Sequence, residues 1–447
     1  MKRAISCVMA AALLLALAAC GDAFERVLRL EGDAESYAFT ARRYEQPIDL
    51  ALAFAEHIET RAEAFDLLLM GADGFTARVS GGDLSGCALV YSKEFGWEFR
   101  SERHPPSANV KNLAGIAVVS TSEDLRTVRF LHGDELRTIT AGQLRLLEYR
   151  RVLREEGASQ KNGLGVTVYT TQCRVPLADM LPGGDSFCAM GFSGEAMFFR
   201  GEASLLAGQN QVDLLLPDGR ILRDLAGVMA DPPGFLITET CHDALRALEE
   251  GQRVMIIELD GMGWDMLPYA PYLDSLAPRR ALACYPSISP VGLAAMLTGV
   301  TPDVNGIRDR ENRAPACEDL FAKAEALGKT AAYIEGRHSL IETSLAPALA
   351  LGAADAYMLA KQALAESPDL LFLHFHEIDE SAHEFGPHAG ETQAAVAEID
   401  GYVRGLAAGF GGRVIITADH GLHGTEDGGN HGLFLPEDML VPYAVTQ

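Results

Sequence analysis

Positive charge is scarce in this chain, and the shortage limits its partners. The 447 residues include 37 Lys and Arg against 62 Asp and Glu, a net charge of -25 at pH 7. No basic stripe is visible that could neutralise a phosphate backbone, which argues against a nucleic acid as the partner. A substrate that carries phosphate would therefore need bound cations to attract it.

Closely spaced cysteines are also missing. Six cysteines follow Cys20, and no two of them form a C-x-x-C pair. We expect them to be buried apolar residues, or Cys173 and Cys188 to form one disulfide in an oxidising compartment.

Long hydrophobic runs are absent after residue 19, where no stretch approaches the ~18 apolar residues of a spanning helix. The start is different: Lys2 and Arg3 precede an apolar run that ends in Leu17-Ala18-Ala19-Cys20. This pattern predicts an export signal over residues 1–19. Small residues before a cysteine resemble the bacterial lipobox, which implies a lipid on Cys20 and a lipoprotein anchored to the bacterial cell membrane. The alternative is an ordinary signal peptide with an incidental cysteine.

The part of the chain before residue 250 is predicted to be β-rich, because short apolar runs alternate with Gly, Asp and Pro. It also repeats itself weakly, which predicts two α+β units at residues 20–122 and 123–249. The repeated segments are residues 46–51 with 174–179, and residues 65–74 with 185–194. We interpret the duplicated region as a structural or substrate-shaping module.

Residues 250–447 show a different sequence pattern, in which apolar strands alternate with helical segments. The expected strands are residues 254–259, 331–334, 370–375 and 414–417, and helical patterns cover 317–327 and 392–406. This alternation predicts an α/β domain with a mostly parallel sheet flanked by helices. In such sheets ligands collect at the carboxyl ends of the strands, so residues just after each strand are the candidates for chemistry.

Carboxylates, imidazoles and serines gather at these expected strand ends. The groups are Asp260-Gly261, Ser287-Ile288-Ser289-Pro290 with Thr298-Gly299, Asp379 with His383, and Asp419-His420-Gly421 with His431. Each group alone is weak evidence, but their shared order and placement predict a site for zinc or a similar divalent ion.

These motifs resemble the alkaline phosphatase superfamily, most closely its type I phosphodiesterase and nucleotide pyrophosphatase branch, over residues 253–443. The resemblance implies an alkaline phosphatase-like fold and two divalent cations, Zn²⁺ or Mn²⁺. It assigns one metal to Asp379, His383 and His431. The other metal is assigned to Asp260, Asp419, His420 and the nucleophile oxygen.

The nucleophile of relatives stands nine residues before the Thr of the Thr-Gly pair, which here indicates Ser289. Ser287 remains a minor alternative. Cys284-Tyr285-Pro286-Ser287 superficially resembles a sulfatase signature, but Ile288 replaces the required arginine and Cys284 stands five residues too early. A formylglycine sulfatase is therefore rejected.

Several positions depart from the family pattern or lie outside it. Gly292 stands where the branch often has an asparagine that donates to phosphate, so one phosphate contact is unaccounted for. Asn305 replaces a usual histidine and is expected to be structural. Four histidines match no ligand position and are left out of the site. These are His374 and His376, expected on opposite faces of their strand, and His388 and His423.

The leading hypothesis is a metal-dependent phosphohydrolase that cleaves phosphodiester or pyrophosphate bonds of a small-molecule substrate through a phosphoserine. A phosphomonoesterase or phosphonate hydrolase of the same superfamily is the near alternative. A surface binding lipoprotein with a degenerate hydrolase domain is a third hypothesis, weakened because all seven ligand positions are filled. The N-terminal region is expected to cover or flank the active-site mouth.

Overall fold

The computed structural model describes residues 27–32, 36–40, 46–58, 65–72, 75–82, 84–120, 127–146, 150–161, 164–208 and 211–446. The predicted export signal and Cys20 lie outside these residues. The chain divides into two compact units. The first comprises residues up to 127, 139–175 and 206–212, and the second comprises residues 128–138, 176–205 and 213–447. The expected mixture of sheets and helices is confirmed.

The first unit is built on a five-stranded sheet with the order β2-β1-β8-β4-β5. A smaller sheet has the order β3-β6-β7, and β11 pairs with β12 as a long antiparallel hairpin. The elements are β1 (Val27–Glu31), β2 (Ser36–Thr40), β3 (Ile48–Asp49), α2 (Leu50–His57), β4 (Phe65–Gly71), β5 (Thr76–Ser80), β6 (Cys87–Ser92), β7 (Gly96–Ser101), η2 (Pro106–Ala108), β8 (Leu113–Ser120), α3 (Ala141–Leu146), β11 (Arg150–Lys161) and β12 (Leu164–Pro176).

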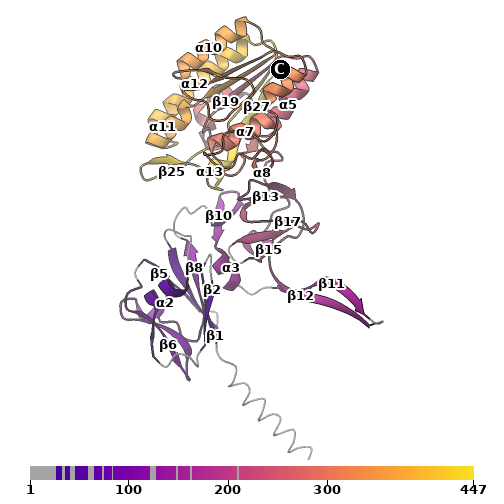
Figure 1. Cartoon of the computed structure of the whole chain (residues 1–447). Helices are drawn as coiled ribbons and strands as arrows, with labels where there is room; N and C mark the ends of the chain where they lie inside the picture. Colours follow the sequence, from indigo (N-terminus) through magenta and orange to yellow (C-terminus); the bar gives the residue numbers. More distant parts are fainter. Residues whose placement is uncertain are drawn as a thin grey trace, which may run out of the picture. The chain divides into compact units, whose positions relative to one another are not determined.

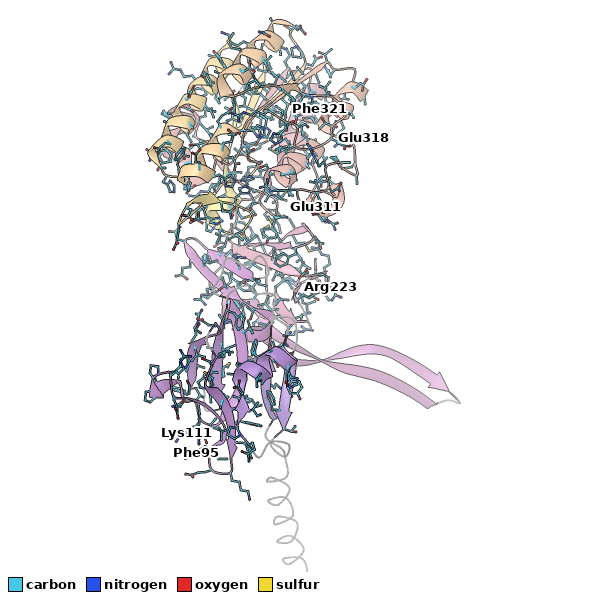
Figure 2. All side chains as sticks on the ribbon, turned by 60° about the vertical axis from the view of Figure 1, so that its left-hand side comes forward. Phe95, Lys111, Arg223, Glu311, Glu318 and Phe321 are labelled. Carbon is cyan, nitrogen blue, oxygen red and sulfur yellow. The ribbon has the colours of Figure 1, made fainter. Side chains whose placement is uncertain are left out.

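The core of the first unit follows from alternation along its strands. In β4, Leu67 and Leu69 are fully buried while their neighbours are partly exposed, as expected for a strand with one face on a core. Trp97 and Phe99 of β7 join the same core. Phe95 lies in the turn before β7, and the ammonium of Lys111 lies 3.8 Å from the centre of its ring (Figure 2). Such a cation–π contact is worth about 0.5–1 kcal/mol at an exposed site.

The second unit contains a five-stranded sheet with the order β10-β9-β18-β13-β14. β18 is parallel to β9 and antiparallel to β13. The elements of this region are β9 (Val128–His132), β10 (Glu135–Ile139), α4 (Leu177–Met180), β13 (Phe187–Gly191), β14 (Ala196–Phe199), β15 (Ser204–Ala207), β16 (Val212–Leu215), β17 (Ile221–Leu222) and β18 (Leu225–Ala230).

The larger sheet of the second unit has seven strands in the order β20-β27-β24-β19-β23-β21-β22. β19 is parallel to both of its neighbours, β23 and β24, whereas β27 runs antiparallel to β24 and to β20. The strands are β19 (Val254–Leu259), β20 (Arg279–Leu282), β21 (Ala331–Glu335), β22 (Ala348–Leu349), β23 (Leu370–Phe375), β24 (Arg413–Thr417) and β27 (Leu440–Thr446). Every residue of β19 and β23 is buried, as expected for central strands covered on both faces.

Helices cover this sheet on both sides. Figure 1 shows α10 and α12 on one side of β19 and β27, and α5 and α7 on the other. The remaining elements are α5 (Glu239–Glu249), η3 (Trp264–Tyr269), α6 (Pro271–Ser275), α7 (Ser289–Thr298), α8 (Pro302–Asn305), α9 (Leu320–Ala326), α10 (Ala353–Ala365), α11 (Glu377–Phe385), α12 (Gly390–Gly409), β25 (His423–Thr425), β26 (Gly428–Asn430) and α13 (Pro436–Met439). Among the described residues, none of these helices is both long and apolar enough to pass through a bilayer.

Four cysteines are buried as expected, whereas Cys317 is partly exposed. Cys87, Cys188, Cys241 and Cys284 are buried, and Cys188 is a free thiol. The alternative disulfide between Cys173 and Cys188 is therefore wrong. Cys188 lies in β13, where burial raises the pKa of its thiol and keeps it in the neutral form.

Candidate metal centre

Three parallel strands deliver the candidate ligands to one edge of the large sheet. β19 pairs in register with β23 and β24, so that Glu258 stands beside His374 and Thr417. Asp260 follows β19, Asp379 lies in the helix after β23, and Asp419 follows β24. Because the carboxyl ends of parallel strands meet at the same edge, the three acidic residues converge.

The first cluster consists of Asp260, Asp419 and His420. The Nε2 atom of His420 lies 3.3 Å from Asp419 Oδ2 and 3.6 Å from Asp260 Oδ1. The imidazole is oriented by its other nitrogen, because Nδ1 lies 3.1 Å from the carbonyl oxygen of Gly421 and must donate to it. Asp419 is held by its other oxygen, Oδ1, which accepts hydrogen bonds from the N–H groups of Gly261 and His420. Such outer hydrogen bonds fix ligands in the orientation that a metal needs.

Ser289 lies directly against this cluster. Its Oγ atom is 3.1 Å from His420 Nε2, and the side chain is buried. Ser289 is the first residue of α7, where Ile288 has extended backbone angles and Pro290 occupies the first turn. The free N–H groups and the dipole at a helix N-terminus favour negative charge at this position. The Oγ of Ser287 instead donates to the carbonyl oxygen of Leu433 at 3.0 Å.

The second predicted set is Asp379, His383 and His431, whereas the ligand atoms beside Asp379 that all lie within 4.8 Å of one another are those of Asp379, His420 and His431. Asp379 and His383 stand one helical turn apart on α11, which places Asp379 Oδ1 3.4 Å from His383 Nε2. His431 Nε2 lies 3.7 Å from the same oxygen. The Nδ1 atoms of His383 and His431 donate to the carbonyl oxygens of Gly429 and Ser287, so both Nε2 atoms are unprotonated; that of His431 accepts from the guanidinium of Arg310 in this structure. The rings of His420 and His431 stack at 3.9 Å, which brings the two clusters together.

Unpaired buried oxygens show that the two clusters fit divalent cations. Within the described residues, Asp260 Oδ1, Asp379 Oδ1 and Asp419 Oδ2 are buried and accept no hydrogen bond. Orphaned carboxylate oxygens are costly unless a cation compensates them. Two ligands at about 2.1 Å from a zinc ion in tetrahedral geometry lie about 3.4 Å apart. The donor spacings of 3.3–3.7 Å around His420 and Asp379 match this value.

Electrostatics point in the same direction. Burial raises the pKa of Asp379 and Asp419 well above the usual value, and the charge of Asp260 raises both further. Burial lowers the pKa of His420 to about 4 and also lowers that of His431. The carboxylates therefore repel one another in the absence of a cation, whereas the imidazoles stay neutral, which is the form that binds metals.

Arg310 is a member of the site that the sequence interpretation missed. One guanidinium nitrogen lies 3.2 Å from His431 Nε2. Burial raises the pKa of Asp379 and lowers that of His431, and the charge of Arg310 offsets part of the first shift and adds to the second. Arg310 follows α8 in the segment after Gly306, and the sequence offers only Arg308-Asp309-Arg310 as a signal. Nothing in that short run indicates which arginine turns inward.

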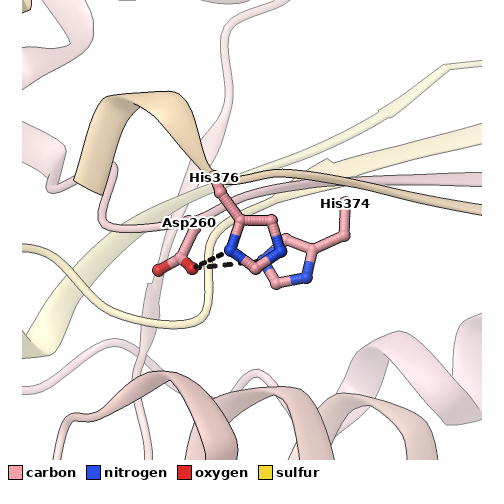
Figure 3. Close-up of side chains that lie close together, drawn as sticks. All are labelled: Asp260, His374 and His376. Atoms are coloured by element: carbon pink, nitrogen blue, oxygen red, sulfur yellow. Dashed lines mark ion pairs between the residues drawn. The ribbon is translucent and has the colours of Figure 1, made fainter. Parts of the chain in front are cut away.

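The expectation that His374 and His376 point to opposite faces was wrong. Residues two positions apart in an extended strand share a face. Their ring centres lie 3.8 Å apart, and both side chains reach the second carboxylate oxygen of Asp260 (Figure 3).

The other polar residues considered from the sequence have structural partners. His423 Nδ1 lies 2.7 Å from Asp438 Oδ1, and His388 Nε2 lies 3.1 Å from Asp265 Oδ2. Asn305 binds the backbone of its own turn, donating to Val300 and accepting from the N–H of Ile307.

Comparison with known proteins supports the resemblance. Residues 341–441 match the family model described as type I phosphodiesterase / nucleotide pyrophosphatase. No curated protein matches the chain. The matched segment includes five of the seven candidate ligands, and Asp260 and Ser289 precede it.

Three solved structures are similar to part of the chain. Murine ectonucleotide pyrophosphatase / phosphodiesterase 5 is 14% identical, with 39% of this chain and 59% of that chain covered and a TM-score of 0.33. An inactive form of the murine protein in complex with AMP is 16% identical, with 39% of this chain and 59% of that chain covered and a TM-score of 0.32. Phosphonoacetate hydrolase from Sinorhizobium meliloti 1021, in complex with phosphonoformate, is 18% identical, with 38% of this chain and 57% of that chain covered and a TM-score of 0.31.

The chain thus spans 57% to 59% of the length of these structures. The predicted resemblance is confirmed over the matched segment, because residues 341–441 match the type I phosphodiesterase / nucleotide pyrophosphatase model.

Proposed function

We propose that this protein is a two-metal phosphohydrolase that cleaves phosphodiester or pyrophosphate bonds with Ser289 as its nucleophile. One observation carries the proposal: Ser289 Oγ lies 3.1 Å from His420 Nε2, inside a cluster whose carboxylates have unpaired oxygens. Asp260, Asp419 and His420 would hold one cation, and Asp379, His383 and His431 would hold the other. Mixed imidazole and carboxylate ligands suit zinc, with manganese as the alternative.

When bound, the two cations would lower the pKa of the serine hydroxyl and neutralise charge on the transferring phosphoryl group. The chain itself positions the nucleophile. The Ser289 hydroxyl gives up its proton and Oγ forms a bond to phosphorus while the bond to the leaving oxygen breaks; the leaving oxygen takes up a proton, so that an alcohol or a phosphate is released. Water then hydrolyses the phosphoserine and restores the hydroxyl. The N-terminus of α7 stabilises the negative charge that gathers beside Ser289 in both steps.

Arg310 supplies a phosphate contact in this proposal. Gly292, on α7, cannot carry the amide donor common in the branch, because a Cβ atom there would lie 2.6 Å from Asp419 Cβ. The guanidinium of Arg310 already points at the Nε2 side of His431. An arginine presents several N–H donors to phosphate oxygens in a fixed geometry, so it can replace an amide donor.

A substrate panel tests the proposed activity. Metal-free protein is supplied with zinc or manganese and given bis(p-nitrophenyl) phosphate, p-nitrophenyl phosphate and p-nitrophenyl sulfate. We expect the diester to be hydrolysed fastest and the sulfate not at all. Fastest turnover of the monoester would favour the phosphomonoesterase alternative, and hydrolysis of the sulfate would contradict the proposal.

We further propose that residues 20–122 and 123–249 are two copies of one ancestral unit, followed by the metallohydrolase domain at 250–447. Matching topology supports the duplication: in sheet order, β2-β1-β8-β4-β5 corresponds to β10-β9-β18-β13-β14. The β1–β8 and β9–β18 pairs are both parallel, and the β4–β8 and β13–β18 pairs are both antiparallel. Each copy also has a register shift at a Met-Gly pair, Met70-Gly71 and Met190-Gly191. The test is an alignment of homologues of each copy with the other, where absence of detectable similarity would contradict common origin.

Export and lipid attachment at Cys20 remain a proposal from the sequence. The expected product is a mature chain that begins with a diacylated Cys20 and partitions into the membrane fraction. Mass spectrometry of the N-terminal peptide from intact cells and from a Cys20→Ala variant tests it. A soluble, unmodified wild-type N-terminus would contradict lipidation.

A further inference from the structure

A pocket of about 240 Å³ lies within the second unit, apart from the candidate metal centre. Its walls come from the β9–β10 turn, the end of β18, the start of η3, β20 and α13. None of the seven candidate metal ligands lines it. Its volume is below the roughly 300–1,000 Å³ of sites for drug-sized ligands, so its occupant must be small.

One wall of this pocket carries a guanidinium with unused donors. The central carbon of the Arg280 guanidinium lies 4.8 Å from the ring centre of Trp264, and both residues line the pocket. Among the described residues, this contact is the only one that the Arg280 side chain makes. A guanidinium that packs on an aromatic ring can still present its N–H groups to an oxyanion in a fork. Arg280 is therefore placed to bind a carboxylate.

Carboxylates that do not pair with Arg280 line the same pocket. They belong to Asp134, Asp265 and Glu437, and within the described part of the chain no ion pair joins any of them to the arginine. Asp265 Oδ2 lies 3.1 Å from His388 Nε2, whereas its Oδ1 is buried and accepts no hydrogen bond from a described residue. Burial raises the pKa of Asp265, His388 opposes the shift, and the charge of Glu437 adds to it. These two carboxylates thus lie close enough to repel each other, and an ammonium group between them would relieve the repulsion.

The remaining wall is largely apolar. Met229 and Leu440 line the pocket together with the Trp264 ring. Asp231 also lines it, but its carboxylate already accepts hydrogen bonds from two backbone N–H groups. A ligand of one sign would leave either the guanidinium or the carboxylates uncompensated. The lining therefore favours a small molecule that has both charges and an apolar side chain.

The wall of this pocket packs against the segments that carry two candidate metal ligands. A Cβ atom on Gly421 would lie 2.1 Å from the carbonyl oxygen of Glu437 and 2.5 Å from Gly263 Cα. Gly421 directly follows His420, and Gly263 follows Asp260 by three positions. An occupant held between η3 and α13 would therefore stabilise the backbone behind the metal centre.

We propose that this pocket binds a free α-amino acid with an apolar side chain. Its carboxylate pairs with Arg280, its ammonium group lies between Asp265 and Glu437, and its side chain packs on Trp264. The amino acid is bound without being converted. Because the pocket shares no residue with the metal centre, its binding does not rest on the proposed hydrolytic activity.

Calorimetric titration of the intact chain with L-leucine tests the proposal. We expect saturable binding with a Kd of about 1 mM or tighter. L-Leucinamide lacks the carboxylate and N-acetyl-L-leucine lacks the ammonium group, so each should bind at least about tenfold more weakly, the loss expected for a charge-assisted hydrogen bond. Absence of saturable binding of L-leucine, or equal affinity for either derivative, would overturn the proposal.

Two neighbouring arginines of β20 provide matched variants. Arg279 also packs on an aromatic ring, with its guanidinium carbon 4.5 Å from the ring centre of Phe235, but it does not line the pocket. We expect Arg280→Gln to weaken L-leucine binding at least about tenfold and Arg279→Gln to leave it unchanged. Equal affinities of the two variants would contradict the site. If Arg280→Gln lacks the native circular dichroism spectrum, Glu437→Gln, at an exposed position of α13, replaces it in the comparison.

Discussion

At the scale of the residue, Arg310 is the side chain whose role depends most on its own geometry. Its guanidinium stands 3.2 Å from His431 Nε2, whereas Arg308, two positions earlier, donates to the carbonyl oxygen of Asp303 at an exposed position. We expect Arg310→Ala to lower kcat/KM for a phosphodiester by roughly 10- to 100-fold, the loss of about 1.5–3 kcal/mol for a charge-assisted hydrogen bond.

Arg308→Ala is the matched control for this loss. Steady-state hydrolysis by the two variants, with the same metal content, measures the difference. An Arg310 variant as active as the Arg308 variant would show that phosphate is neutralised without this guanidinium.

Asp438 makes a separate pH prediction. Burial raises the pKa of Asp438 from 3.8 to about 6, although the neighbouring His423 partly offsets the effect. Because the folded-state pKa is raised, the folded protein binds the proton more tightly than the unfolded chain. The contribution of Asp438 to stability is therefore present below pH 3.8 and is lost as pH rises to about 6.

An Asp438→Asn variant lacks this titration. The free energy of unfolding in urea should fall more steeply for the wild type than for the variant as pH rises through this window. Parallel pH profiles of the two proteins would refute the assignment.

At the scale of the element, α7 packs tightly against the segment that carries Asp419. A Cβ atom on Gly292 would lie 2.6 Å from Asp419 Cβ and 2.8 Å from its carbonyl oxygen. We expect Gly292→Ala to lower the free energy of unfolding by about 1–3 kcal/mol, because the backbone of Asp419 must move.

Gly401, in the exposed middle of α12, has open space around it and provides the control. There alanine should leave stability unchanged or raise it by up to about 1 kcal/mol, from its better helix propensity. Urea unfolding of both variants measures the contrast, and equal effects would contradict the close packing of α7.

The strands of the large sheet were the easiest elements to predict. β19 and β23 match the expected runs 254–259 and 370–375, because continuous apolar segments between polar turns indicate buried strands. Residues directly after these strands could be identified for the same reason. The direction of side chains in loops could not be predicted, because Arg310 turns inward through packing that no local pattern encodes. The shared direction of His374 and His376 could have been predicted from strand periodicity, since residues two positions apart point to the same face.

At the scale of the whole molecule, the second unit joins β-rich residues to the seven-stranded sheet. Phe192, after β13, packs edge-to-face on Tyr285 at 5.7 Å, and Tyr285 meets Phe434 at 6.1 Å. Tyr285 precedes Ser289 by only a few positions, and Phe434 follows His431 by only a few positions. The β-rich residues of this unit therefore support the backbone segments that carry Ser289, the proposed nucleophile, and His431, a candidate ligand.

Gly227, in β18, tests this support. A Cβ atom there would lie 2.2 Å from Phe434 Cδ1, so Gly227→Ala should destabilise the unit by about 1–3 kcal/mol. Hydrogen exchange should show faster exchange in both β18 and β24. Gly234→Ala, in open space, should change neither strand. Faster exchange in β18 alone would show that the two sheets unfold independently.

The most direct test of the central claim compares Ser289→Ala with Ser287→Ala. The Ser289 hydroxyl faces His420, whereas the Ser287 hydroxyl donates to Leu433. With matched zinc content and bis(p-nitrophenyl) phosphate as substrate, the Ser289 variant should lose roughly 1,000-fold or more of kcat, as expected for removal of a nucleophile. The Ser287 variant should retain activity within about tenfold, since it loses one buried hydrogen bond. A Ser289 variant that hydrolyses the diester as fast as the wild type would contradict the assignment of Ser289 as the nucleophile.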